Sequence, residues 1–245
     1  MTATHLSDGL RAREHVFFLT MALAMAAGVF AGFARTFYLR PWFPEVAAPA
    51  EPVFIVHGLV FTAWMLLVVV QSGLVASGRV RQHRALGIAG AGLAAAVVVL
   101  GVAGALVAAA RPGGFMNVPV PPLQFLLVPL LDMTLFATCV ALAIAWRRFP
   151  QTHKRLMLLA TVNMLTAAFA RVPLEITFNN VLVAFILSDL FIVALVIWDR
   201  LDLGRLQPVT VWMGGLIVLS QPLRLALSET AAWQALASWM VGATG

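Results

Sequence analysis

Residues 53–87 read VFIVHGLVFTAWMLLVVVQSGLVASGRVRQHRALG, and this stretch decides the class of fold. Its apolar first part is long enough to cross a bilayer, which takes about 20 residues. His57, Trp64 and Gln71 recur every seven residues, close to two helical turns, so the three side chains share one face. Because lipid cannot satisfy a polar stripe, this face is predicted to contact other protein.

The composition indicates a membrane protein. Of the 245 residues, 62% are hydrophobic and 11% are charged, whereas a soluble domain is about half apolar and about a quarter charged. The formal charge of +6 does not indicate nucleic-acid binding, because Lys and Arg gather at the ends of apolar runs, as topology determinants do. The lipid bilayer is therefore the predicted partner, and nucleic acid is not. The single cysteine, Cys139, excludes an internal disulfide.

The hydropathy pattern predicts an all-α membrane protein with one transmembrane domain over residues 1–245. Seven apolar runs are expected to span the bilayer, at residues 16–33, 53–75, 87–110, 125–146, 156–172, 181–198 and 209–227. The third run is rich in glycine and alanine, which let helices approach closely, so spans two to five are expected to form a central bundle. Residues 228–240 are predicted to form an amphipathic helix on the outer surface, with Ser228 as its N-cap.

The distribution of positive charge predicts the orientation. With seven spans, eleven of the Lys and Arg side chains fall on the side of the N-terminus and five on the other side. The positive-inside rule then places the N-terminus in the cytoplasm and the C-terminus outside.

Two histidines are candidate ligands for a cofactor. His83 and His153 precede the third and fifth runs, so they are expected at similar depth near the inner surface. Two imidazoles that face each other inside a helical bundle are the ligand set of a b-type haem. The alternatives are hydrated histidines among interfacial arginines, or a metal site. His57 cannot belong to this site, because eighteen residues, or about 27 Å of helix, separate it from Val75.

A second set of polar residues is predicted in the outer half of the membrane. Its members are ionisable or amide side chains on or after the outer halves of the spans: His57, Asp132, Arg171, Glu175, Asn179, Asn180, Asp189, Gln221 and Arg224. By depth, Asp132 is expected to pair with Arg171, and Asp189 with Arg224. Such charges either form structural ion pairs or line an outward-facing pocket for a proton, an ion or an anionic head group.

Three segments resemble a bacterial family of predicted membrane proteins of unknown function. They are VHGLVFTAWMLLVVVQ at 56–71, HRALG at 83–87 and HKRLMLLATVNMLTAAFARV at 153–172, and they match the family's HRxxG and HRxxM motifs. Lys154 and Leu156 depart from the pattern, which usually has Arg and an aromatic residue there. A weaker similarity to cytochrome b561-like helical cores implies haem b between His83 and His153. The resemblance implies a multi-pass protein of the bacterial inner membrane.

These patterns predict a haem-binding electron-transfer protein that exchanges electrons with a quinone or a redox partner protein. One alternative is a transporter or sensor with an outward-facing polar site. The other is a membrane assembly subunit without chemistry of its own. No nucleotide-binding loop and no HExxH motif is present, so the sequence identifies no enzyme class.

Overall fold

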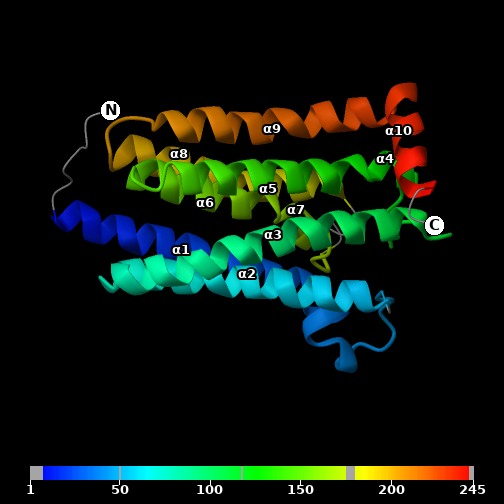
Figure 1. Cartoon of the computed structure of the whole chain (residues 1–245), viewed down its shortest axis with the longest axis horizontal. Coiled ribbons are helices and arrows are strands. Elements are labelled where there is room, and N and C mark those ends of the chain that lie inside the picture. The colour runs from blue at the N-terminus through cyan, green and yellow to red at the C-terminus, as the bar shows by residue number, and fades with distance from the viewer. Residues whose placement is uncertain (1–7, 50, 117, 175–179, 243–245) are drawn as a thin grey trace.

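The protein is a bundle of long helices (Figure 1). The computed structural model describes residues 8–49, 51–116, 118–174 and 180–242, and every regular element in these ranges is helical. The elements in chain order are α1 (Asp8–Phe33), η1 (Ala34–Tyr38), η2 (Arg40–Trp42), α2 (Pro52–Ala76), α3 (Val80–Ala110), α4 (Pro122–Phe125), α5 (Leu127–Ala145), α6 (Pro150–Asn163), α7 (Thr166–Phe169), α8 (Val181–Leu201), α9 (Pro208–Ser228) and α10 (Ala231–Gly242). The all-α fold class is confirmed. Glu175 and Asn179 lie outside the described residues.

Six segments are long and apolar enough to cross a membrane: Asp8–Tyr38, Pro52–Ala76, Val80–Ala110, Pro122–Ala145, Val181–Leu201 and Pro208–Ser228. They correspond to the predicted runs one to four, six and seven. Large apolar side chains cover the surface of these helices; Ile88 is 80% exposed and Leu219 is 70% exposed. Because apolar faces of this extent are stable only in lipid, the chain is a multi-pass membrane protein.

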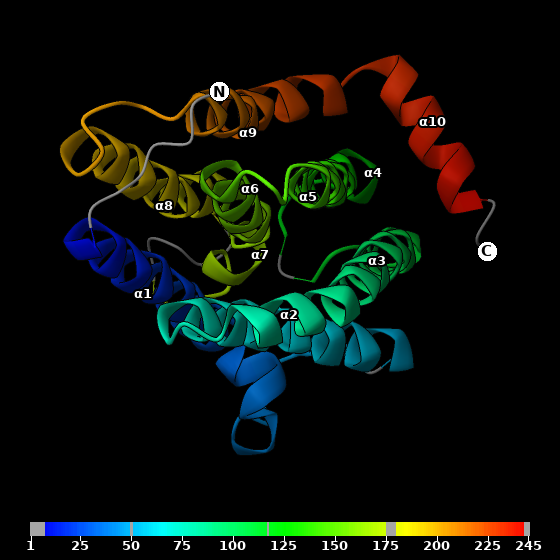
Figure 2. The ribbon, with the colours of Figure 1, turned by 60° about the vertical axis from the view of Figure 1, so that its left-hand side comes forward.

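The long helices run along one axis (Figure 1). Following the predicted orientation, we call the end that holds the start of α1 and the α2–α3 turn the inner end. The end that holds α4 and α10 is the outer end. Figure 2 shows α6 and α7 between α5, α8 and the α1–α2 pair.

The fifth predicted run, 156–172, is a broken helix. α6 stops at Asn163, whose side-chain amide donates a hydrogen bond of 2.6 Å to the carbonyl oxygen of Asp132 on α5. The backbone then tightens: Met164 N–H bonds to Thr161 O and Leu165 N–H bonds to Val162 O, three residues back. Such a tight turn within a helix is typical of a site under local constraint.

Three helices begin well before their predicted runs. α1 starts at Asp8 rather than residue 16, α3 at Val80 rather than residue 87, and α6 at Pro150 rather than residue 156. Hydropathy marks only the part of a helix inside the hydrocarbon, whereas the backbone stays helical through the charged interface. Both His83 and His153 therefore lie in the first turns of helices and not in loops.

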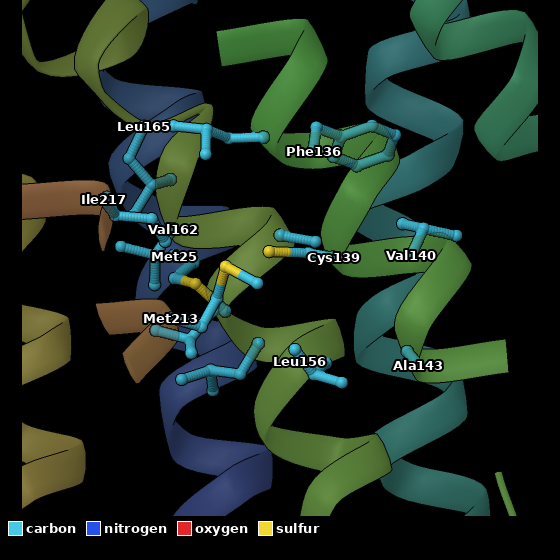
Figure 3. Packing of buried hydrophobic residues seen from close by; sticks show 14 of the residues in the cluster. Met25, Phe136, Cys139, Val140, Ala143, Leu156, Val162, Leu165, Met213 and Ile217 are labelled. Atoms are coloured by element: carbon cyan, nitrogen blue, oxygen red, sulfur yellow. The ribbon is translucent and has the colours of Figure 1, made fainter. Parts of the chain in front are cut away.

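The hydrophobic core forms around α6. Eight of its fourteen residues are buried, and Figure 3 shows its side chains packed against those of α1, α5 and α9. Trp64 of α2 is 1% exposed. Its indole N–H donates to the Thr161 hydroxyl over 3.3 Å, and its ring meets the edge of Phe136. The predicted stripe of α2 thus faces protein at Trp64, and spans two to five share one core with α1 and α9.

At the outer end, α10 packs against the ends of α3 and α4 through Ala237 and Trp233, whose indole N–H donates to Leu123 O over 2.7 Å. The predicted cap is corrected. Ser228 is the last residue of α9, and Thr230 instead accepts the N–H of Trp233 at the start of α10. The Ser228 hydroxyl donates to Leu225 O of its own helix over 2.7 Å, so it does not cap α10.

Helix α1 packs against α7 through glycine. A methyl group added at Gly32 would overlap the backbone carbonyl of Ala168, so only glycine permits this approach. Gly28, one turn earlier, faces the ring of Phe169.

We expect Gly32→Ala to destabilise the protein by about 1–3 kcal/mol, because the colliding atoms belong to the backbone and cannot rotate away. Gly73→Ala is the matched control, since an added methyl group at Gly73 would have no neighbour within 4 Å. Thermal unfolding of both variants in detergent is the measurement. Equal melting temperatures for the two variants would contradict the α1–α7 contact.

Candidate functional site

His83 of α3 and His153 of α6 lie side by side at the inner end. Their ring centroids are 6.2 Å apart, and the ring planes are nearly perpendicular, at 84°. Both side chains are half-buried. Each histidine occupies the first turn of its helix. The two helices start at the same end of the bundle, because α4 and α5 return the chain to that end between them. The structure thus brings together the two predicted ligand residues.

The ring nitrogens of the two histidines differ in their contacts. Nδ1 of His153 lies 2.9 Å from the carbonyl oxygen of Ala143. A carbonyl accepts only, so Nδ1 carries a proton, and Nε2 is the nitrogen with a lone pair in the neutral ring. This is how proteins commonly orient a histidine that binds a metal. Nδ1 of His83 is buried and has no hydrogen-bond partner, while the ring interacts with the backbone of Gln71.

The two imidazoles are a donor set of two nitrogen ligands, which could hold a haem iron. Among the described residues, no group of three His, Cys, Asp or Glu side chains is placed to hold a metal ion, and zinc sites use three or four such ligands. Haem iron needs two ligands from the protein at most, because the porphyrin supplies the others. With metal–nitrogen distances of about 2 Å, two imidazoles on one metal have centroids roughly 6 Å apart.

A buried ion pair includes Arg155, two residues after His153 on α6. Arg155 of α6 and Asp199 of α8 are both fully buried and form a salt bridge. Asp199 also accepts a 2.6 Å hydrogen bond from the Thr210 hydroxyl of α9, and Arg155 donates to the side chain of Gln151 over 2.6 Å. Both charged groups therefore have polar partners, and these contacts connect α6, α8 and α9.

Helix α1 enters the same region through Glu14. This buried carboxylate pairs with Lys154 over 2.5 Å and accepts from Gln151 Nε2 over 3.3 Å. The sequence pattern does not reveal this inner network, because Lys154 and Arg155 resemble the other basic residues at the ends of apolar runs. A signal was nevertheless present: Asp199 directly follows the apolar run 181–198, and Glu14 lies two residues before the run 16–33.

The outer polar residues separate into two groups. In the first group, Arg224 of α9 forms a salt bridge with Asp132 of α5, and its Nη2 donates to the Ser220 hydroxyl over 2.7 Å. Asp189 of α8 accepts a 2.8 Å hydrogen bond from Gln221 of α9. Asp132, Gln221 and Arg224 are buried. The side chains around this group leave no water-sized space between them.

The second group lies toward α1, α2 and α3. His57 Nδ1 lies 3.3 Å from Leu100 O, and the ring stacks on Phe61. Leu100 follows His83 by seventeen residues on α3, or about 25 Å, so the predicted separation of His57 from the inner pair is confirmed. Arg171 donates to Ala167 O over 2.6 Å and covers the ring of Phe33.

The two predicted ion pairs are wrong. Asp132 pairs with Arg224 rather than with Arg171, and Asp189 bonds to Gln221 rather than pairing with Arg224. The depth of each residue was consistent with both arrangements. The choice depends on which helix packs beside α5 at that depth, and this helix is α9.

Comparisons with known proteins add no assignment: no protein-family model matches the chain, and no curated protein or solved structure matches it significantly. The function must therefore be argued from the residues.

The Asp132–Arg224 pair predicts a specific pattern of stability. Asp132→Asn strands a buried guanidinium, so we expect a loss on the order of 3–5 kcal/mol, the cost of breaking a buried pair in soluble proteins. Combining it with Arg224→Gln should recover much of that loss. The measurement is a double-mutant cycle on the free energy of unfolding in detergent.

Arg171→Gln is the matched control, because Arg171 has no carboxylate partner among the described residues. Its effect should add to that of Asp132→Asn without coupling. Coupling to Arg171, with additivity to Arg224, would reverse the assignment.

Proposed function

We propose that this multi-pass membrane protein carries single electrons on one b-type haem, which His83 and His153 would hold. The observation that carries the proposal is the pair of imidazoles on α3 and α6, with ring centroids 6.2 Å apart. The resemblance to cytochrome b561-like helical cores supports the same ligand pair. When bound, the haem would supply a one-electron couple whose potential depends on its ligands and surroundings.

The residues of the chain have definite tasks in this proposal. The carbonyl of Ala143 holds the Nδ1 proton of His153 and so keeps Nε2 available as a ligand. The buried Arg155–Asp199 pair, two residues along α6, fixes the rotation of the helix that presents His153. Leu156 and Leu159, which follow His153 on α6, are fully buried and hold this helix in the hydrophobic core.

Positive charge surrounds the site at the inner end. Arg79, Arg81 and Arg84 flank His83, and Arg147 and Arg148 lie in the turn before His153; all five are exposed. Guanidinium groups bind carboxylates strongly, so this rim would favour the carboxylate groups of a haem. An electron carrier also needs a donor and an acceptor, and we propose a quinone in the bilayer or a redox partner protein in these roles.

We further infer seven crossings in a bacterial inner membrane, with the N-terminus in the cytoplasm. Residues 150–169, which form α6 and α7, extend about 30 Å at 1.5 Å per residue. They run beside α8 from the Arg155–Asp199 pair to the Thr166–Ser188 contact of 3.4 Å. The start of α1 and helix α10 lie at opposite ends of the bundle (Figure 1), which an odd number of crossings requires.

The outer polar residues support a transporter or sensor less well. Asp132 and Arg224 satisfy each other, and the surrounding side chains leave no water-sized space. A ligand pocket would need room and free polar groups. An assembly subunit without a cofactor would give the inner histidines no role.

The absorption spectrum of protein purified from a haem-replete host tests the haem proposal. We expect a Soret band and a sharp α-band on reduction. His83→Ala and His153→Ala should each abolish the low-spin spectrum, because one axial ligand is lost. His57→Ala, at the opposite end of the bundle, is the matched control and should retain it. Colourless wild-type protein, or an unchanged spectrum in both inner variants, would reject the proposal.

Reporter fusions test the topology. A reporter inserted after Gly78, in the α2–α3 turn, should report the cytoplasm, and one after residue 245 should report the exterior. The physical reason is the excess of Lys and Arg at the inner end. If both reporters lie on the same side, α6 and α7 enter and leave the membrane at the inner end and the crossing number is six.

A further inference from the structure

A polar cluster inside the membrane has an unbalanced charge. We define the mid-membrane cluster by its seven polar side chains, from α5 to α9: Asp132, Asn163, Thr166, Ser188, Asp189, Gln221 and Arg224. Asp189 is the ninth residue of α8, so it lies about 12 Å along the helix from its outer start and about 18 Å from its inner end. Both distances place its carboxyl group well within the hydrocarbon.

The mid-membrane cluster contains two carboxyl groups and one guanidinium group. The helices packed most closely against α8 are α6, α7 and α9. Near Asp189, α6 and α7 contribute only the neutral Asn163 and Thr166, and α9 contributes Arg224 and the neutral Gln221. Asp132 of α5 completes the set and forms the salt bridge with Arg224. One guanidinium thus serves two carboxylates, and the ionised cluster would carry one uncompensated negative charge.

The immediate contacts of Asp189 do not compensate that charge. Its Oδ1 accepts a 2.8 Å hydrogen bond from the neutral amide of Gln221. Its neighbours on α8 include Leu190 and Ile186, which are 54% and 62% exposed and therefore face lipid. An ionised carboxylate in such surroundings is expensive, and polar side chains there bind a partner or stay neutral.

We propose that Asp189 is a proton-binding site within the membrane. The carboxylate takes up one proton on the oxygen that does not face Gln221, becomes a neutral carboxyl group, and returns the carboxylate when the proton leaves. The Asp132–Arg224 pair stays ionised throughout. A proton fits the site better than a metal cation does, because the packed side chains leave no water-sized space. This inference does not depend on haem binding at the inner end.

Infrared spectroscopy of the full-length protein in lipid vesicles is the first test. At neutral pH, the wild-type protein should show the carbonyl band of a protonated carboxylic acid, and Asp189→Asn should remove it. Asp8→Asn is the matched control, since Asp8 is exposed at the start of α1, and it should leave the band unchanged. Gln221→Leu should shift the same band by removing its hydrogen-bond donor, which tests the assignment even if Asp189→Asn does not fold.

The second test is the melting temperature as a function of pH, measured in sodium chloride and in choline chloride. Ionisation of Asp189 would strand a charge in lipid, so the wild-type melting temperature should fall toward alkaline pH, and Asp189→Asn should reduce that fall. The result should be the same in both salts. Absence of the infrared band at neutral pH, or a stabilisation that requires sodium, would overturn the proton assignment.

Discussion

The fold depends on the rule that a charge inside a membrane must have a partner. Arg155 and Asp199 are completely buried, and either one alone would be costly in hydrocarbon. Their salt bridge, together with the Thr210 hydroxyl, joins α6 to α8 and α9 at the inner end. A buried pair of this kind is weak evidence for extra stability. Its clearer effect is geometric, because it allows only one rotation of α6.

The rotation of α6 has consequences along the whole helix. At its first turn, His153 faces His83 of α3. Two turns further, Thr161 meets the indole of Trp64 from α2. At its end, Asn163 bonds to the backbone of α5 and the helix breaks. One helix therefore carries the candidate ligand, the centre of the core and the edge of the mid-membrane cluster.

The two candidate sites have different physical characters. The inner site contains two half-buried imidazoles beside exposed arginines, and Nδ1 of His83 has no hydrogen-bond partner; there we propose haem binding. The mid-membrane cluster leaves no water-sized space, and one oxygen of Asp189 accepts a hydrogen bond from Gln221, so the change that we propose there is the protonation of one carboxyl group. The chain thus separates an interfacial site from a charge-balance site in the hydrocarbon.

The sequence alone determined the class of the protein and the approximate position of most helices. Hydropathy reports transfer into lipid, which depends on each segment by itself, so residues 53–75 and 181–198 could be recognised without any neighbour. Periodicity also predicted that the stripe of His57, Trp64 and Gln71 faces protein, and the depth of His83 and His153 predicted that they lie at one level. The break after Asn163 was not predictable, because it depends on a carbonyl of another helix.

Only the tertiary structure decided which polar residues are partners. Asp132 could reach either Arg171 or Arg224 by depth, and the packing of α9 beside α5 selected Arg224. Arg155 and Asp199 looked like ordinary interfacial charges until three helices enclosed them. Depth is a property of one segment, whereas a salt bridge depends on the rotation and the neighbours of two segments. The amino-acid sequence therefore determines the depth of each residue, and the packing of the whole bundle decides which residues form salt bridges.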